Sequence, residues 1–392
     1  MKRAPHILLA GGGTGGHVYP AIAIADAIRA LEPAAEIAFV GTRDRMEAQA
    51  VPKAGYSLYP ITVAGFQRSL SVRNLEFPFK LLRGFVQSWN LVGGFDPDVA
   101  VGTGGYVAGP ALLAAWMRGR PVVIQEQNAY AGVTNRLLSL LATRIHLAFP
   151  EAKEYVPARR AVISGNPTRK ALTEATHDAG RDHFDLPDDA RVLLVVGGSL
   201  GSAALNTVLE EQVHALLDAD EAVHVLWQTG NRYYDDLAAR VDQHPRLQIM
   251  KYIDQMDKAY AAADLALCRA GAITCSELMV TGTPAVLVPS PNVTADHQTK
   301  NARSMERGGA ARLLPETALS DRFLEVATDL LSGPAQREQM AEAARSMARP
   351  DAARRIAEDI LELASARDGG ATDGRARRTT GMTSGPRRTP TT

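Results

Sequence analysis

The sequence is poor in cysteine and has no excess of charge of either sign. Its two cysteines, Cys268 and Cys275, are too few for a disulfide framework or a four-ligand zinc site, and we expect both to be small packing residues. The 43 basic and 43 acidic side chains cancel, which argues against a general nucleic-acid binder because such proteins need a basic surface. Any attraction to a charged partner must therefore be local.

Long apolar runs are also missing. No segment offers the roughly 20 apolar residues that a membrane-spanning helix needs, and the first ten residues hold too short an apolar run for a signal peptide. We therefore expect a cytoplasmic protein. Residues 365–392 are poor in apolar side chains and rich in Gly, Thr, Arg and Pro, a composition that predicts a disordered tail.

What the sequence does contain is one pattern that occurs twice. A short apolar run at 6–10 enters a glycine turn and a helical stretch at 20–31, and RVLLVVGGSLGSAALN repeats this order from Arg191. Further strands are predicted at 37–40, 99–101, 122–124, 145–147, 223–227, 247–250, 265–267 and 285–288. The pattern predicts an α/β fold of two Rossmann-like halves joined near residue 168. Both sets of strand ends should face a cleft between the halves.

The first glycine turn lies in AGGGTGGHVYPA. Gly11, Gly13 and Gly16 match the dinucleotide pattern G-x-G-x-x-G, but the second strand runs into Gly41-Thr42, where a ribose-binding acid would be needed. Hydride transfer is therefore disfavoured. Bare backbone at a helix N-terminus still suits an anion. His17 follows this turn, and the sequence leaves a capping role and a role as general base or substrate contact equally open.

A second glycine turn occurs in the same half, in VAVGTGGYVAGP at 99–110. Two such turns at one edge of a sheet indicate a cleft wall that admits a bulky polar ligand. Just before it, Asp96-Pro97-Asp98 has the D-x-D spacing that holds a metal in some sugar-nucleotide enzymes. The proline favours a turn instead.

In the second half, CRAGAITCSELMVTGTP begins at a strand end and opens a helix that Gly282 and Pro284 close. Glu277 either completes a capping box that begins at Thr274, or accepts the two hydroxyls of a ribose whose diphosphate lies on the helix terminus. The motif leaves these alternatives open. The polar run DHQTKN at 296–301 follows the last predicted strand and should overhang the same cleft.

Taken in order, the motifs AGGGTGGHVYPA, GTGGYVAGP, QEQNAYAG, GNPTR, VVGGSLGS, RAGAITCSEL and DHQTKNA closely resemble those of the MurG family over residues 6–364. These bacterial enzymes add N-acetylglucosamine (GlcNAc) from UDP-GlcNAc to the undecaprenyl-linked muramyl-pentapeptide of peptidoglycan synthesis. The resemblance implies a GT-B fold, inversion at the anomeric carbon, no bound metal and no other cofactor. It implies an acceptor domain at 1–168, onto which a helix near 348–364 packs back, and a UDP-GlcNAc domain at 169–347.

The resemblance also assigns roles to residues. Either His17 or Glu126 would be the base for the acceptor's 4-hydroxyl, and Glu277 would hold the ribose. The other expected substrate contacts are Thr14, Gly15 and Gly16 on the donor, Asn128 and Gln298 on GlcNAc, Arg169 and Ile253 near uracil, Ser199 on the diphosphate, and Ala272, Ile273, Thr274, Cys275 and Ser276 on phosphate and sugar. Two positions depart from the family pattern. Gln125 replaces a usual His and Leu200 a usual Gln, which affects donor affinity more than the reaction.

A lipid-linked acceptor implies contact with an anionic membrane surface. Residues 68–89 carry Phe79 and Phe85 among other apolar residues, with several basic side chains and the single acid Glu76. By itself this composition favours a partly buried helix pair with a basic outer face, and together with a polyprenyl-linked acceptor it favours peripheral attachment at the cytoplasmic face of the inner membrane, where other cell-wall synthesis proteins are compatible partners. Two alternatives remain, a hydrolysing UDP-GlcNAc 2-epimerase and a non-catalytic UDP-GlcNAc sensor.

Overall fold

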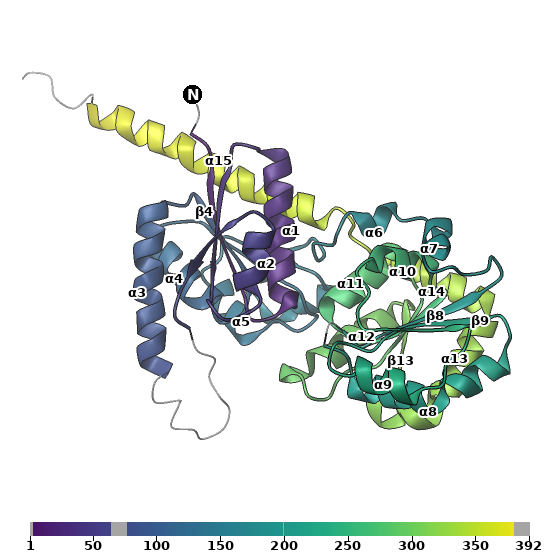
Figure 1. Ribbon diagram of the computed structural model, residues 1–392. Coiled ribbons are helices and arrows are strands. Elements are labelled where there is room, and N and C mark those ends of the chain that lie inside the picture. The colour runs from purple at the N-terminus through teal and green to yellow at the C-terminus, as the bar shows by residue number, and fades with distance from the viewer. Residues whose placement is uncertain (1–2, 64–76, 199, 380–392) are drawn as a thin grey trace, which may run out of the picture.

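The computed structural model describes residues 3–63, 77–198 and 200–379, and these form two parallel β-sheets flanked by helices (Figure 1). The seven strands of the first sheet have the order β3-β2-β1-β4-β5-β6-β7, and the six of the second have the order β10-β9-β8-β11-β12-β13. In each sheet the strand order reverses next to the first strand, beside the glycine turn that follows it. This confirms the predicted α/β fold of two Rossmann-like halves.

The strands of the first sheet are nearly continuous apolar runs, because helices cover both faces of the sheet. Its strands are β1 (His6–Gly11), β2 (Glu36–Gly41), β3 (Ser57–Pro60), β4 (Val99–Gly104), β5 (Val122–Glu126), β6 (Arg144–Leu147) and β7 (Ala161–Ile163). The helices are α1 (Gly15–Leu31), α2 (Glu47–Lys53), α3 (Phe77–Phe95), α4 (Ala108–Met117) and α5 (Val133–Ser139), with 3₁₀ turns at Pro150–Tyr155 and Ala158–Arg160.

The second sheet follows the same plan. Its strands are β8 (Arg191–Val196), β9 (Val223–Gln228), β10 (Leu247–Met250), β11 (Leu265–Cys268), β12 (Ala285–Leu287) and β13 (Ala311–Leu313). Around it lie α6 (Ala171–Glu174), α7 (His177–His183), α8 (Ala203–Ala219), α9 (Tyr234–Arg240), α10 (Met256–Ala262), α11 (Ala272–Thr281), α12 (His297–Arg307), α13 (Leu319–Ser332) and α14 (Pro334–Met347), with 3₁₀ turns at Thr294–Asp296 and Glu316–Ala318. The strands missed from sequence, β3, β7 and β13, are short edge strands without a continuous buried run.

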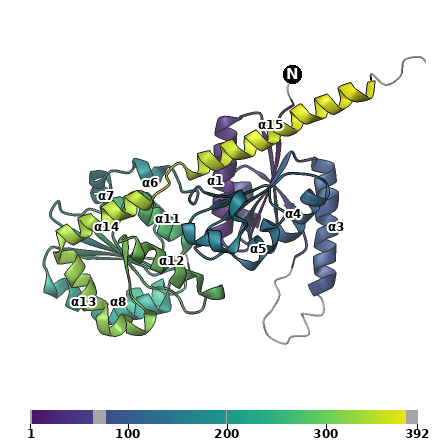
Figure 2. The same ribbon diagram turned by 180° about the vertical axis from the view of Figure 1, so that it is seen from behind.

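The last helix, α15 (Ala352–Thr379), returns from the second half to the first and lies beside α1 in both views (Figures 1 and 2). Its Ile356 and Ile360 are fully buried in the same core as Ile7 and Ile24. The helix extends to Thr379, past residue 365, from which the sequence predicts a disordered tail. Residues 380–392 lie outside the described residues.

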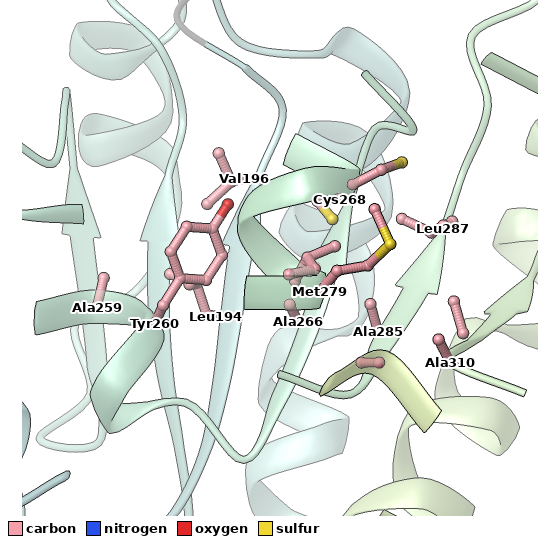
Figure 3. Packing of buried hydrophobic residues seen from close by; sticks show 14 of the residues in the cluster. Leu194, Val196, Ala259, Tyr260, Ala266, Cys268, Met279, Ala285, Leu287 and Ala310 are labelled. Atoms are coloured by element: carbon pink, nitrogen blue, oxygen red, sulfur yellow. The ribbon is translucent and has the colours of Figure 1, made fainter. Parts of the chain in front are cut away.

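Both cysteines belong to the core of the second half, where Figure 3 shows Cys268 near Leu287. Cys268 and Cys275 are free and buried, and burial raises the pKa of Cys268 to about 12. Their predicted role as packing residues is confirmed. Tyr260 lies in the same cluster, with its ring among Leu194, Val196 and Ala259.

Candidate active site

The two glycine turns of the first half pack against each other. A Cβ atom at Gly11 would lie 2.0 Å from Oγ1 of Thr103, and one at Gly105 would lie 2.3 Å from the carbonyl oxygen of Gly12. Gly105 also has a left-handed φ of +80°, which side chains disfavour. Much of the bare backbone noticed in the sequence is therefore required by this close contact.

His17 lies where these turns meet, in the first turn of α1. Its Nδ1 atom is 3.0 Å from the carbonyl oxygen of Thr103 and 3.1 Å from Oε1 of Gln127. A Cβ atom at Gly104, whose φ is +110°, would lie 2.7 Å from Nδ1. The second glycine turn thus leaves room for the ring and holds one of its nitrogens.

Glu47 is a buried carboxylate that the sequence did not single out, and it lies beneath the first glycine turn. Its Oε2 accepts from the Gly13 N–H at 2.9 Å, and its Oε1 accepts from the N–H and hydroxyl of Thr42 at 3.0 and 2.8 Å. Burial by itself raises the pKa of Glu47, but these hydrogen bonds outweigh it, so the pKa lies below the ordinary 4.5. Because Glu47 accepts from the Gly13 N–H, this N–H is not available to a dinucleotide phosphate.

Glu126, the other candidate base, is surrounded by donors. Oε1 accepts from the Asn128 N–H at 3.0 Å and from Nδ2 of Asn128 at 3.2 Å, while Oε2 accepts from the Gly132 N–H at 3.0 Å and Nδ2 of Asn135 at 2.8 Å. A carboxylate engaged by four donors holds the loop that follows β5 in place. The oxygens of Glu126 are thus already bonded within its own half, whereas Nε2 of His17 has no hydrogen bond among the described residues.

The D-x-D segment is committed to protein contacts. Oδ2 of Asp98 accepts from the His6 N–H at 2.9 Å, at the start of β1. Asp96 has a left-handed φ of 49° and pairs with Arg3 and Arg120. The segment is therefore the turn that the proline favours.

In the second half, α11 begins at Ala272, after the N-cap Gly271, and ends at Gly282, whose φ is 70°. The capping-box interpretation of Glu277 is wrong, because Thr274 lies inside the helix. Oε2 of Glu277 accepts from the Tyr260 hydroxyl at 3.2 Å, and Oε1 lies 3.4 Å from Nη2 of Arg169. Burial raises the pKa of Glu277, and the contacts with Arg169 and Tyr260 offset part of that rise.

A pocket of about 960 Å³ lies between the two halves, lined by α1, by residues 167–170 and by the second half. Of the residues expected to bind the donor, Arg169, Ile253, Ile273, Thr274 and Glu277 line it. Tyr19, Tyr252 and Tyr260, which the sequence did not single out, also line it. The aromatic residues had no motif to reveal them, since they reach the pocket from three separate elements.

Comparisons with known proteins identify the family. The models for the glycosyltransferase family 28 N-terminal and C-terminal domains match residues 7–147 and 192–356. The chain is 66% identical over 362 residues, 92% of this chain and 98% of the relative, to the UDP-N-acetylglucosamine--N-acetylmuramyl-(pentapeptide) pyrophosphoryl-undecaprenol N-acetylglucosamine transferase of Salinibacter ruber. It is 32% identical to the crystal structure of Acinetobacter baumannii MurG, with a TM-score of 0.75 over 91% of this chain and 99% of that one. The chain belongs to the MurG family.

A UDP-GlcNAc 2-epimerase from Neisseria meningitidis is a more distant likeness. It is 15% identical to this chain, with a TM-score of 0.63 over 91% of this chain and 100% of that one. Such a likeness indicates a shared fold only. It gives the epimerase alternative no support beyond the fold.

The other residues expected from the MurG resemblance differ in their hydrogen bonds. Thr14 is the N-cap of α1, which begins with Gly15 and Gly16, but its side chain makes no capping bond. Oδ1 of Asn128 accepts from Nδ2 of Asn301 in the second half at 3.2 Å. Gln298 accepts from the Ser290 N–H through Oε1 at 2.8 Å. Ser199 lies outside the described residues.

Within the MurG motif RAGAITCSEL, the side chains of Cys275 and Ser276 are buried in the protein. Cys275 is fully buried, and Oγ of Ser276 donates to the carbonyl oxygen of Ala272 at 3.0 Å. Any ligand contact from Cys275 or Ser276 would therefore come from the backbone. The N–H of Ile253 is likewise bonded, to Oε1 of Gln228 at 2.8 Å.

The two departures from the MurG pattern have opposite environments. Leu200 is 79% exposed within the glycine turn of the second half, GGSLG, and its side chain cannot hydrogen-bond a ligand. Gln125 is fully buried, and its Nε2 donates to Oδ1 of Asn166 at 2.7 Å. Leu200 thus bears on ligand contact, whereas Gln125 belongs to the internal structure of the site.

Proposed function

We propose that this chain transfers GlcNAc from UDP-GlcNAc to the 4-hydroxyl of N-acetylmuramic acid in undecaprenyl-pyrophosphoryl-MurNAc-pentapeptide, with inversion at the anomeric carbon, in peptidoglycan synthesis. Relatives at 66% and 42% identity, each matched over more than nine-tenths of both chains, are named as N-acetylglucosamine transferases that act on this acceptor. The observation that carries the proposal within this chain is the interdomain pocket that holds Glu277 and adjoins α11.

Glu277 is proposed to bind the ribose of the donor. Its carboxylate lies on the pocket wall with Tyr260 and Arg169 as neighbours, and a carboxylate can accept hydrogen bonds from both hydroxyls of a vicinal diol. Burial raises the pKa of Tyr260 well above its ordinary value, so its hydroxyl remains a donor to Glu277. This hydrogen bond fixes the position of the Glu277 carboxylate before UDP-GlcNAc binds.

The leaving UDP carries negative charge that the second half must stabilise. The first turn of α11 offers free backbone N–H groups and the positive end of the helix dipole. One well-placed donor of this kind is worth on the order of 3 kcal/mol in a transition state. We propose that Ser199 adds a hydroxyl donor to the same diphosphate.

His17 is proposed to remove the proton of the acceptor's 4-hydroxyl. As that oxygen bonds to the anomeric carbon, the bond from this carbon to the UDP oxygen breaks, and the proton passes to the imidazole. Such a base typically contributes about 100-fold or more to the rate. A sensor of UDP-GlcNAc has no use for this group, since its ligand would leave unchanged.

We infer that the chain attaches to the cytoplasmic face of the inner membrane through α3. Among the described residues no helix is long and apolar enough to cross a membrane. On α3 the side chains of Phe79 and Leu82 are 76% and 62% exposed. Phe85 is partly buried against the core, with its ring 6.1 Å from that of Trp89, so the proposed lipid contact rests on Phe79 and Leu82. Residues 68–76 of the basic segment lie outside the described residues.

The function is tested by transfer of labelled GlcNAc to a short-chain muramyl-pentapeptide lipid in EDTA. We expect turnover by the parent protein and a loss of at least about 100-fold in kcat for His17→Ala, with UDP affinity by calorimetry unchanged. A folded parent that binds UDP but forms no glycosylated lipid would overturn the proposal in favour of the epimerase or the sensor. A mild loss in His17→Ala would place the base elsewhere.

Membrane attachment is tested by sedimentation with vesicles that contain phosphatidylglycerol. The variant Phe79→Ser/Leu82→Ser should bind at least about fivefold less, because exposed apolar side chains supply much of the insertion energy of a peripheral helix. Turnover of a water-soluble acceptor should not change. The matched control is Val162→Ser, which alters an exposed apolar residue of the edge strand β7. Equal binding by the double variant and the parent would refute the role of α3.

A further inference from the structure

A continuous chain of buried amides runs from His17 to the second half of the molecule. Its members are Gln127, Gln125 and Asn166, all of them buried. A buried amide is costly unless its donors and acceptors are bonded. The direction of each hydrogen bond therefore decides what the chain can do to the histidine.

The partners of Gln127 identify which end of its amide faces the imidazole. Its Nε2 donates to the carbonyl oxygens of Thr103, at 2.6 Å, and Gln125, at 3.1 Å, which can only accept. Oε1 is then the atom 3.1 Å from Nδ1 of His17, and the carbonyl oxygen of Thr103 also faces Nδ1 at 3.0 Å. With two acceptors around it, Nδ1 carries the proton, and Nε2 keeps the lone pair that a base needs.

The chain continues from Gln127 to α11. One N–H of the Gln127 amide serves Thr103, and the other is shared between the carbonyl oxygen and Oε1 of Gln125. Nε2 of Gln125 donates to Oδ1 of Asn166 at 2.7 Å. Nδ2 of Asn166 in turn donates to Oγ of Ser276 at 2.9 Å and to the carbonyl oxygen of Ala272 at 3.3 Å. The last two partners belong to the first turns of the helix assigned to the donor.

We propose that Gln127 is a positioning residue that fixes the tautomer of His17, and that Gln125 and Asn166 tie this glutamine to α11. The proposal rests on the function proposed above. When Nε2 takes the proton of the 4-hydroxyl, the imidazolium donates through Nδ1 to Gln127 and Thr103, which stabilise it. His17 therefore has its lone pair on Nε2, as a base requires, when the two halves pack as they do in this structure.

The glutamine at position 125 gives this link a property that the usual histidine of the family would lack. Gln125 both accepts, from Gln127, and donates, to Asn166, and an amide keeps these two roles at every physiological pH. A protonated imidazole at this position would have two donors and no acceptor for Gln127. The link in this chain is therefore independent of pH.

The first test replaces Gln127 with methionine, which is similar in length but cannot hydrogen-bond. We expect kcat to fall about 10- to 100-fold, while UDP affinity and the KM for UDP-GlcNAc stay within about twofold. In ¹⁵N-histidine spectra the imidazole of His17 should change from mainly protonated at Nδ1 to a mixture of tautomers. The spectra need no turnover, so they test the proposal even where the proposed function fails.

Two controls separate positioning from general damage. Gln248→Met removes a comparable hydrogen bond, from Nε2 to the carbonyl oxygen of Phe184 at 2.6 Å, and should leave kcat unchanged. In the His17→Ala background, Gln127→Met should cause no further loss, because there is no tautomer left to set. An equal loss in that background, or unchanged ¹⁵N signals in Gln127→Met, would overturn the proposal.

The second test compares Gln125→Leu with Gln125→His. The leucine breaks the link and should lower kcat about tenfold at every pH. The histidine can accept and donate while neutral, so it should restore kcat above pH 7.5, with a loss as the pH falls through the ordinary imidazole pKa of about 6.5. Identical pH profiles for the histidine variant and the parent would overturn the role of Gln125.

Discussion

Glu47 offers the sharpest test of how the first glycine turn is held. The substitution Glu47→Gln keeps the shape of the side chain but leaves it one acceptor oxygen. In the parent, Oε1 serves both donors of Thr42 and Oε2 serves the Gly13 N–H. The glutamine oxygen can best replace Oε1, which keeps two hydrogen bonds. Its NH₂ group then faces the Gly13 N–H, donor against donor.

The magnitude follows from these contacts. A hydrogen bond to a buried charged group contributes about 1.5–3 kcal/mol, and a neutral one about 1 kcal/mol. Losing the Gly13 bond and weakening the two to Thr42 should lower the free energy of unfolding by about 2–4 kcal/mol at pH 7. Because the pKa of Glu47 lies below its ordinary 4.5, its contribution is complete above that value and is lost as the pH falls through the folded-state pKa.

The assay is urea denaturation of the parent, Glu47→Gln and the control Glu154→Gln, an exposed glutamate in the same half. The variant should unfold at lower urea than the parent, and the difference should shrink as the pH is taken below 4.5. Hydrogen exchange should speed up at residues 12–18 before other parts of the first sheet. A parent and variant of equal stability at pH 7, or a difference that grows in acid, would refute the reasoning.

Two further predictions concern a buried histidine and the ribose contact. Burial lowers the pKa of His146, which lies 3.6 Å from Asp359 of α15, to about 4 from the ordinary 6.5. The contribution of neutral His146 to the free energy of unfolding is therefore complete above pH 6.5 and is lost toward pH 4. Between these values the free energy of unfolding should fall by about 3 kcal/mol more in the parent than in His146→Gln. For Glu277→Gln, UDP affinity by calorimetry should fall about tenfold, about 1.4 kcal/mol, whereas 2′-deoxy-UDP affinity should change by less than about threefold.

Each of these has an outcome that contradicts it. Parallel stability curves for the parent and His146→Gln between pH 7 and pH 4 would mean that His146 does not titrate in folding. Equal losses of UDP and 2′-deoxy-UDP affinity in Glu277→Gln would mean that the carboxylate does not contact the 2′-hydroxyl. Comparison of the two nucleotides is its own control, since both test the same folded variant.

Several features of this protein were readable from sequence because they depend on local patterns. The buried strands of the two parallel sheets are continuous apolar runs, and each first strand ends in a glycine turn before a helix. Edge strands such as β3 escaped prediction because one strand edge has no partner and the side chains are largely exposed. The motifs around His17 and Glu277 were also local, so their positions near the cleft could be expected.

The partners of these residues were decided by tertiary structure. Nδ1 of His17 meets Thr103 and Gln127, which are 86 and 110 residues away in sequence, and no local pattern encodes such pairs. The role of Glu277 depended on where α11 begins, because the sequence TCSE at 274–277 forms a capping box only if Thr274 is the N-cap of the helix.

The sequence by itself determined two α/β halves with glycine turns, since backbone sterics and apolar periodicity act over a few residues. Only the folded chain decided that Glu47 occupies the first turn, that Glu126 is engaged by four donors, and that buried amides connect His17 to α11. Those outcomes depend on which donors and acceptors are brought together when the sheets and helices pack. In a buried site each polar group must find a partner, and the partners available there come from distant parts of the chain.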